Sequence, residues 1–308
     1  MQKLKIIVPS YNEGKCIFPF YEGVMPYLDN PNYSYEIIYV NDGSKDDTLE
    51  QIKELKKKDD RVQYISFSRN FGKEAAMLAG LKASLDADAV VIIDADLQHP
   101  PFLIKEMIQK REEGYKLIFA KRKSRKGDNI IKRASAHSFY SLFNKYSDVS
   151  MEQSSTDFML MDKSVVKAFV EMPDEFRFTK GITAYVGFKK CFVEFDYVAR
   201  ENGETKWTLK KLFKYGINGL GQFSDVFLFV PKVVAFLSFL VSVSSIFLYA
   251  FHVIELNTFL IMLLIPLLFV LTNITLYVVI YVLYSNKKET MKRPIYFVEE
   301  SSFDEKAL

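Results

Sequence analysis

The chain has 308 residues, of which 49% are hydrophobic and 26% are charged, and its formal net charge is only +3. This length allows one sizeable core and an additional segment, and so small a net charge gives no reason to expect a nucleic-acid partner. Cys16 and Cys191 have no motif spacing, so neither a disulfide framework nor a zinc site is suggested, and we expect both to be small core residues.

The first 120 residues alternate short apolar runs with helical patterns. Apolar runs predict strands at residues 5–9, 35–40, 62–67, 90–93 and 117–120, and helices are expected at 46–58, 73–85 and 102–113. Between the first two strands we expect an irregular helical stretch broken by Pro19, Pro26 and Pro31. The alternation predicts an α/β fold with a doubly wound, mainly parallel sheet.

Beyond residue 120 the pattern is less regular. A basic loop precedes an expected helix at 131–144, a strand at 156–162, a short helix from residue 164, a further segment at 178–186 and an alternating strand at 191–198. Residues 209–223 place apolar side chains on one side and lysines on another, which predicts an amphipathic helix in the membrane interface. Ordinary packing of this helix on a core is the alternative.

Two long stretches, residues 233–254 and 256–285, contain no acidic side chain, lysine or arginine. Each exceeds the roughly 18 to 20 apolar residues that cross a bilayer, so we expect a hairpin of two transmembrane helices rather than two buried core helices. The expected organisation is a cytoplasmic domain at 1–205, a juxtamembrane helix at 206–228, the spans at 229–285 and a cytoplasmic tail at 286–308.

The orientation follows from the charges that flank these spans. Met1 leads directly into a strand without a signal-peptide pattern, and lysines and arginines stand both before the first span and after the second. We therefore expect a plasma-membrane protein whose large N-terminal domain and both termini are cytoplasmic. Residues 116–133 hold eight basic residues against one acid, which favours contact with phosphate or anionic membrane lipids over a merely solvated surface.

The apolar run at residues 90–93 ends in two carboxylates, Asp94 and Asp96, separated by one residue. Ligands bind at the carboxyl ends of strands in open α/β sheets, and two neighbouring acids repel each other unless a cation lies beside them. A divalent, oxygen-preferring metal suits this position. The alternative is that an acid here only caps the following helix, close to His99.

Similar polar motifs follow the other strands: Val8-Pro9-Ser10-Tyr11-Asn12-Glu13, Val40-Asn41-Asp42-Gly43-Ser44, Ser68-Arg69-Asn70-Phe71-Gly72-Lys73 and Asp94-Ala95-Asp96-Leu97-Gln98. Together with Thr156-Asp157-Phe158, the segment from Arg200 to Trp207, the paired spans and Arg293-Pro294-Ile295-Tyr296, they resemble the inverting GT-A glycosyltransferases that act on polyprenyl phosphates. This group includes bactoprenol glucosyltransferase and dolichyl-phosphate mannose synthase. The resemblance covers nearly the whole chain.

The resemblance assigns roles to individual positions. It implies Mg²⁺ or Mn²⁺ on Asp94, Asp96 and Gln98, with Asp96 and Asp157 as the catalytic acids. It implies contacts of the nucleotide-sugar with Pro9, Tyr11, Glu13, Asp42 and Asp94, although Asp42 has an alternative role as a turn former before Gly43. It implies that the acceptor phosphate meets Arg122, Arg125, Lys132, Arg133, Arg200 and Lys206.

The implied activity is inverting transfer of a hexose, glucose or an N-acetylhexosamine, from a UDP-sugar to undecaprenyl or another polyprenyl phosphate. The lipid-linked product would serve cell-envelope glycan modification. A phosphate monoester has a second pKa of about 6 and is mostly dianionic in the cytoplasm, so its oxygen is already a nucleophile. The protein has to hold two phosphates near each other and align the attack.

Two other functions compete with this one. A processive polysaccharide synthase would carry a Gln-X-X-Arg-Trp motif, which the segment from Arg200 to Trp207 lacks. A non-catalytic membrane scaffold would have no reason to keep Asp94, Asp96 and Asp157 together. The resemblance is also compatible with a homo-tetramer and with a downstream flippase and acceptor glycosyltransferase as partners.

Overall fold

The computed structural model describes residues 1–123, 139–141, 143–147, 149–152, 155–174, 177–196, 209–223, 233–234, 236–237, 240, 254–290 and 293–304. The chain forms two compact units. The first comprises Met1–Tyr140, Met151–Thr208 and Arg293–Leu308, and the second comprises Ser141–Ser150 and Leu209–Lys292.

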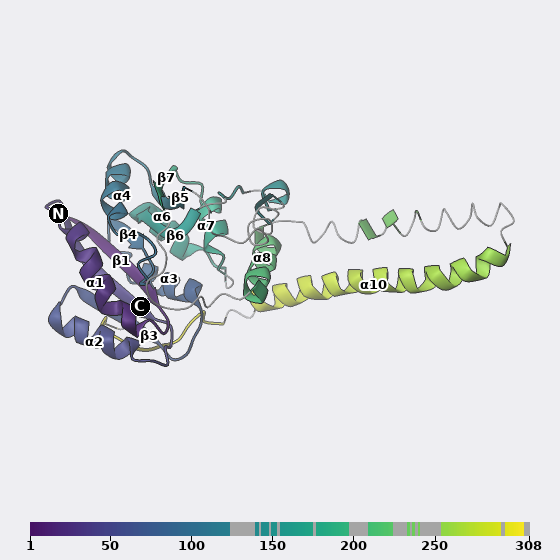
Figure 1. Ribbon diagram of the computed structural model, residues 1–308, viewed down its shortest axis with the longest axis horizontal. Helices are drawn as coiled ribbons and strands as arrows, with labels where there is room; N and C mark the ends of the chain where they lie inside the picture. Colours follow the sequence, from purple (N-terminus) through teal and green to yellow (C-terminus); the bar gives the residue numbers. More distant parts are fainter. Residues whose placement is uncertain are drawn as a thin grey trace. The chain divides into compact units, whose positions relative to one another are not determined.

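An eight-stranded sheet in the order β7-β5-β6-β4-β1-β2-β3-β8 forms the centre of the first unit (Figure 1). Its strands are β1 (Gln2–Ser10), β2 (Tyr33–Asn41), β3 (Val62–Phe67), β4 (Ala89–Ile92), β5 (Leu117–Arg122), β6 (Ser155–Asp162), β7 (Lys190–Phe195) and β8 (Val298–Ser301). The strands β1 to β4 are mutually parallel where they pair, whereas β6 and β8 run antiparallel to their neighbours. The sheet is therefore mixed, with the parallel part that the sequence predicts at its centre.

Helices cover both faces of this sheet. α1 (Gly14–Leu28), α2 (Thr48–Lys58) and α4 (Leu103–Glu112) share one apolar cluster with the β1 side chains Leu4, Ile6 and Val8. The next side chain along the alternation, Ile7, faces α3 (Lys73–Lys82), where a Cβ on Gly80 would lie 2.5 Å from Ile7 Cγ2. The described part of this unit also contains the short helices α6 (Lys163–Glu171) and α7 (Thr179–Tyr185).

The predicted proline break in the first helix is wrong. α1 runs without interruption through Pro19 and Pro26, and it buries Ile17, Phe20 and Val24 at helical spacing. Each proline removes one backbone donor, but burial of the apolar face offsets this loss, because most helical stability in proteins comes from tertiary packing.

The C-terminal residues do not form the separate tail that the sequence suggested. Residues 296–303, here called the strap, run along the sheet edge, and β8 pairs antiparallel with β3. The Tyr296 ring stacks on Phe67 with the centroids 4.8 Å apart, and Ser68 N donates to Phe297 O at 3.1 Å. The chain thus returns to the first unit after the apolar segment.

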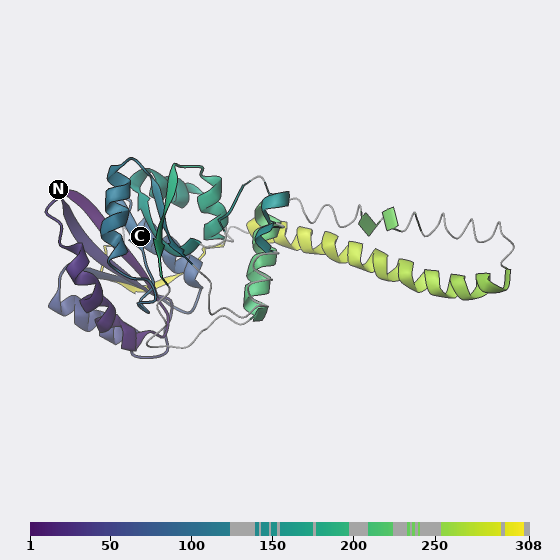
Figure 2. The same cartoon turned by 45° about the horizontal axis from the view of Figure 1, so that its top comes forward.

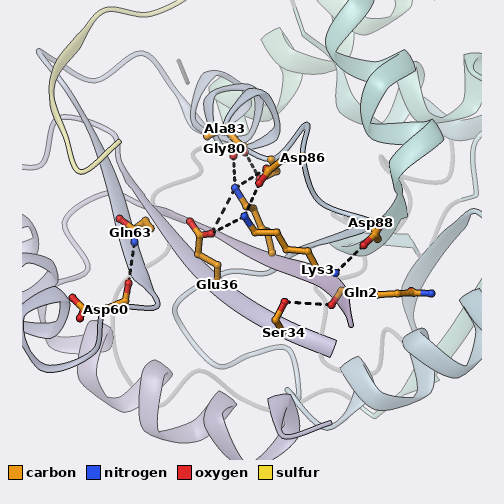
Figure 3. Close-up of polar contacts among 12 residues, drawn as sticks. Gln2, Lys3, Ser34, Glu36, Asp60, Gln63, Gly80, Ala83, Asp86 and Asp88 are labelled. Carbon is orange, nitrogen blue, oxygen red and sulfur yellow. Dashed lines mark hydrogen bonds and ion pairs between the residues drawn. The ribbon is translucent and has the colours of Figure 1, made fainter. Parts of the chain in front are cut away.

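A polar cluster lies at the amino end of β1 (Figure 3). Lys5 is only 3% exposed, and its amine donates to Ala83 O at 2.7 Å and pairs with Asp86 at 2.8 Å. Lys3 reaches Asp86 at 2.5 Å and Glu36 at 3.5 Å. This cluster ties β1 and β2 to the loop after α3, away from the strand ends that carry the motifs.

The second unit contains α8 (Leu209–Phe223) and the long α10 (Ile254–Thr290). Figure 2 shows α10 as an unbroken helix. Tyr281 of α10 donates to Asn218 of α8 at 2.9 Å. Among the described residues, one helical stretch is long and apolar enough to cross a bilayer, Leu267–Tyr284, with a mean hydropathy of 2.2. Most of the first predicted span, 233–254, lies outside the described residues, so the two-helix hairpin stays a prediction.

Candidate active site

The loop after β4 carries Asp94, Asp96 and Gln98. Ile93 N still bonds to Ile7 O, so the chain stays at the sheet until Asp94, whose side chain is 27% exposed. Asp96 Oδ1 accepts a hydrogen bond from Gln98 N at 3.1 Å. Leu97 has a φ of 56°, a left-handed conformation that is costly for a bulky residue and is typical of functional loops. The loop is thus held in a tight turn that keeps both acids at the carboxyl end of β4.

Asp157 comes from β6, the antiparallel neighbour of β4. The register that pairs Ile92 with Met159 leads Asp94 and Asp157 toward each other at the end of the sheet. Lys73, the first residue of α3, lies between them: its Nζ is 2.6 Å from Asp94 Oδ1 and 2.9 Å from Asp157 Oδ2. One ammonium therefore joins two of the predicted site acids.

The charges in this cluster reinforce one another. Burial opposes ionisation of Asp157, but the positive charges of Lys73 and Lys180 outweigh it and hold the pKa of that carboxyl below its ordinary value. Burial also opposes the charge on Lys73, yet Asp157 and Asp94 raise the pKa of its amine above the usual range. Both groups are consequently charged throughout the physiological pH range.

The segment that leads into α3 is fixed by Asp42, which is only 3% exposed. Its two oxygens accept hydrogen bonds from Phe71 N at 2.6 Å, Gly72 N at 2.9 Å and Asn70 Nδ2 at 2.9 Å. Burial raises the pKa of Asp42 to about 6, although the two backbone donors favour its charged form. In this arrangement the carboxylate holds the loop before Lys73.

Gly43, directly after Asp42, is required by the close approach of two loops. Its φ is 61°, and a Cβ at this position would lie 2.3 Å from the Arg69 carbonyl carbon. The positive φ of Gly43 thus lets the second and third motif loops approach closely, while the Asp42 side chain bonds to the third loop.

The first motif loop joins the same edge. Pro9 pairs with Val40 in the sheet register, and Tyr11 and Glu13 follow as half-exposed residues. Asn12 has a φ of 52° and links this loop to the second one, since Asn12 N donates to Ser44 Oγ at 2.9 Å and Lys45 N donates to Asn12 Oδ1 at 2.8 Å. Pro9, Tyr11 and Glu13 thus lie on the sheet edge that carries Asp42.

His99 is a further side chain in this region, and it is 5% exposed. Its ring packs against Phe158 and Phe195, and neither nitrogen has a hydrogen-bond partner among the described residues. Burial lowers the pKa of its imidazole, and Nδ1 lies 3.9 Å from Asp94 Oδ2. A neutral imidazole beside an acid can donate a hydrogen bond to it after a small movement.

Of the predicted acceptor-phosphate residues, the structure describes Arg122, which ends β5, is half-buried and acts electrostatically on His99. The remaining ones lie outside the described residues: Arg125, Lys132, Arg133, Arg200 and Lys206.

The described residues hold no group of three acidic, histidine or cysteine side chains that could bind a metal by themselves. Two neighbouring carboxylates suffice, however, when the metal arrives with a phosphorylated ligand, because Mg²⁺ typically uses one or two carboxylates together with phosphate oxygens and water. Asp94 and Asp96 fit that kind of site.

Two residues of this cluster were missed by reasoning from the sequence. Lys73 and His99 were given no role, although each stands in or next to a motif after a strand. The available signal was their position, because a cation at the carboxyl edge of a sheet lies close to any acids there.

Comparisons with known proteins fit this geometry. Residues 5–169 match the family model described as glycosyl transferase family 2. CsbB of Bacillus subtilis (strain 168), named only at the level of a glycosyltransferase, is 43% identical over 221 residues, covering 72% of this chain and 67% of that protein. The prophage bactoprenol glucosyl transferase homolog of Escherichia coli (strain K12) is 38% identical over 242 residues, covering 77% of this chain and 79% of that protein.

A solved structure shares the fold. Glucosyl-3-phosphoglycerate synthase from Mycobacterium tuberculosis, in complex with phosphoglyceric acid, superposes with a TM-score of 0.51 at 17% identity, covering 71% of this chain and 78% of that one. This likeness supports the predicted GT-A-like α/β sheet. The family match spans more than half of the chain and the relatives cover most of it, so the protein is a transferase that belongs to glycosyl transferase family 2.

Proposed function

We propose that this enzyme transfers a hexose, glucose or an N-acetylhexosamine, with inversion from a UDP-sugar to undecaprenyl or another polyprenyl phosphate at the cytoplasmic face of the plasma membrane. Relatives from Escherichia coli and from Shigella phage SfV, each 38% identical over 242 residues, are named for glucosyl transfer to bactoprenol. The observation that carries the proposal is the cluster of Asp94, Asp157 and Lys73 in a chain that also contains an apolar helix of membrane-spanning length.

On the donor side, Asp94 and Asp96 would hold the divalent cation. Bound there with the diphosphate, Mg²⁺ or Mn²⁺ would neutralise the charge that grows on the leaving group. Asp157, kept ionised by Lys73, supplies a negative charge toward the sugar, whose ring becomes positive as its bond to phosphate breaks. The tight turn at Leu97 would hold Asp94 and Asp96 at the end of β4 for this role.

On the acceptor side the nucleophile is a phosphate oxygen that is already ionised, so no protein base is needed. Arg122 at the end of β5 suits the role of binding this phosphate, because guanidinium groups bind phosphate through two parallel hydrogen bonds. Arg125, Lys132, Arg133, Arg200 and Lys206 are proposed to complete the phosphate contacts.

The connectivity supports two membrane crossings. Met151–Thr208 and Arg293–Leu308, on either side of the apolar segment, belong to the same compact unit, and β8 is paired with β3 in one sheet. A chain that leaves one side of a bilayer and returns to the same side crosses it an even number of times. If α10 supplies one crossing, a second one falls within residues 209–253.

The test incubates the purified full-length protein with radiolabelled UDP-glucose or UDP-N-acetylglucosamine, undecaprenyl phosphate and Mg²⁺ or Mn²⁺, and then extracts the lipid. We expect label in the organic phase, loss of that label with excess chelator, and its loss in Asp157→Asn. Asp162→Asn is the matched control, since Asp162 lies at the other end of β6 and caps α6. Label in a water-soluble polymer would instead indicate a processive synthase, and no product with any UDP-sugar would refute the proposal.

A further inference from the structure

We propose that the Lys73 ammonium takes the place of the divalent cation while the site is free of metal, and neutralises the charge of Asp94. When the metal binds, Lys73 releases Asp94 and keeps its contact with Asp157, for which it is a positioning residue. This inference rests on the proposed function. It adds a residue to which neither the sequence nor the comparisons gave a role.

The first support is the geometry of the contacts. Asp94 and Asp157 come from neighbouring antiparallel strands, and a single ammonium at 2.6 Å and 2.9 Å serves both. The three side chains are 25–34% exposed, so the cluster borders solvent, from which a ligand can approach. Without a cation between them, two carboxylates that meet at one ammonium would repel each other.

The second support is competition for one carboxylate. A divalent ion binds carboxylate oxygens at about 2.0–2.1 Å in the case of Mg²⁺, so an ion on either oxygen of Asp94 would lie close to the ammonium that contacts Oδ1 at 2.6 Å. Like charges repel strongly at such distances. We therefore expect metal binding to Asp94 to push Lys73 away from that carboxylate.

The third support is that Lys73 can move without its backbone. The residues before it, Phe71 and Gly72, are bonded to buried Asp42, and Lys73 begins α3. Its four-carbon side chain carries a compact charge that can turn from two carboxylates toward one. The contact with Asp157 at 2.9 Å remains available after Asp94 is released.

The test measures Mn²⁺ binding by isothermal titration calorimetry on the full chain in detergent with UDP present, because the site needs phosphate oxygens, and with no UDP-sugar and no lipid. A titration of Mn²⁺ into UDP alone supplies the blank. Removing the competing ammonium in Lys73→Met is expected to tighten Mn²⁺ binding about 10-fold, the size of one strong charge-assisted contact. Lys73→Arg keeps the charge and should bind Mn²⁺ as the wild type does. Lys73→Gln repeats the measurement with a neutral polar side chain, so that a folding defect in Lys73→Met does not decide the result.

Lys180→Met is the matched control for charge alone. Lys180 also acts electrostatically on Asp157, but its amine bonds to Tyr140 at 3.1 Å. We expect its removal to change Mn²⁺ affinity less than about 3-fold, since the effect of a non-contacting, partly solvated charge is weak. Unchanged or weaker Mn²⁺ binding in both neutral Lys73 variants, or equal tightening in Lys180→Met, would overturn the inference. Because the assay uses no substrate, a failure of the proposed function would appear separately, as absent sugar transfer by the wild type.

Discussion

Tyr296 in the strap carries a buried hydroxyl that has no hydrogen-bond partner among the described residues, so we expect Tyr296→Phe to stabilise the protein. Burial also raises the pKa of this phenol to about 12, which agrees with a site that water reaches poorly. The phenylalanine ring would keep the stack on Phe67 and the contact with Lys82, whose amine lies 5.4 Å from the ring centroid.

The expected change in the free energy of unfolding follows from these contacts. A buried polar group without a partner costs about 1–3 kcal/mol, so removing the hydroxyl should raise the free energy of unfolding by about 1 kcal/mol. Tyr296→Ala removes the ring as well, and with it the stack and the burial of a half-exposed aromatic side chain. We expect the free energy of unfolding of Tyr296→Ala to fall by about 2 kcal/mol, which is less than the loss for truncating a fully buried ring.

Differential scanning calorimetry of the full chain in one detergent compares the three proteins. A change of 1 kcal/mol corresponds to a shift of about 2–4 °C for a domain of this size. Tyr296→Phe should therefore melt a few degrees above the wild type, and Tyr296→Ala below it. A lower melting temperature for Tyr296→Phe would show that the hydroxyl makes a stabilising hydrogen bond, and the reasoning from its burial would be refuted.

Three further predictions concern stability. Lys5→Met should lower the free energy of unfolding by about 2 kcal/mol, because it removes a buried cation and leaves Asp86 without that ion pair. Lys3→Met removes a lysine that is 38% exposed and should lower the free energy of unfolding by less than about 1 kcal/mol in the same calorimetric assay. The folded protein binds the Asp42 proton more tightly than the unfolded chain does, because the pKa of Asp42 is raised to about 6. The stability of the wild type relative to Asp42→Asn should thus fall as the pH rises from about 4 to about 6, and a pH-independent difference in melting temperature would contradict this. Gly80→Ala should lower the free energy of unfolding by about 1–3 kcal/mol, because the new Cβ would lie 2.5 Å from Ile7 Cγ2. An unchanged melting temperature would show that α3 shifts freely.

Much of the fold was predictable because its signals are local. Alternating apolar runs predicted the strands of the central sheet, and the polar motifs after them predicted which edge carries the site. The Asp94 and Asp96 pair was recognisable from its place after a fully buried strand. The functional roles of these acids stay predictions, as does the first membrane span.

Tertiary structure decided the features that depend on residues far apart in the chain. Pro19 and Pro26 indicated a broken helix, yet burial of one apolar face keeps α1 continuous. The strap begins with strand-forming residues, but its sequence does not say which strand it joins, and the tertiary structure pairs β8 antiparallel with the edge of β3. Lys73 looks like an ordinary helix-start residue in the sequence. Only the pairing of β4 with β6 brings Asp94 and Asp157 to its amine, because short-range charge contacts are set by the three-dimensional fold and not by spacing along the chain.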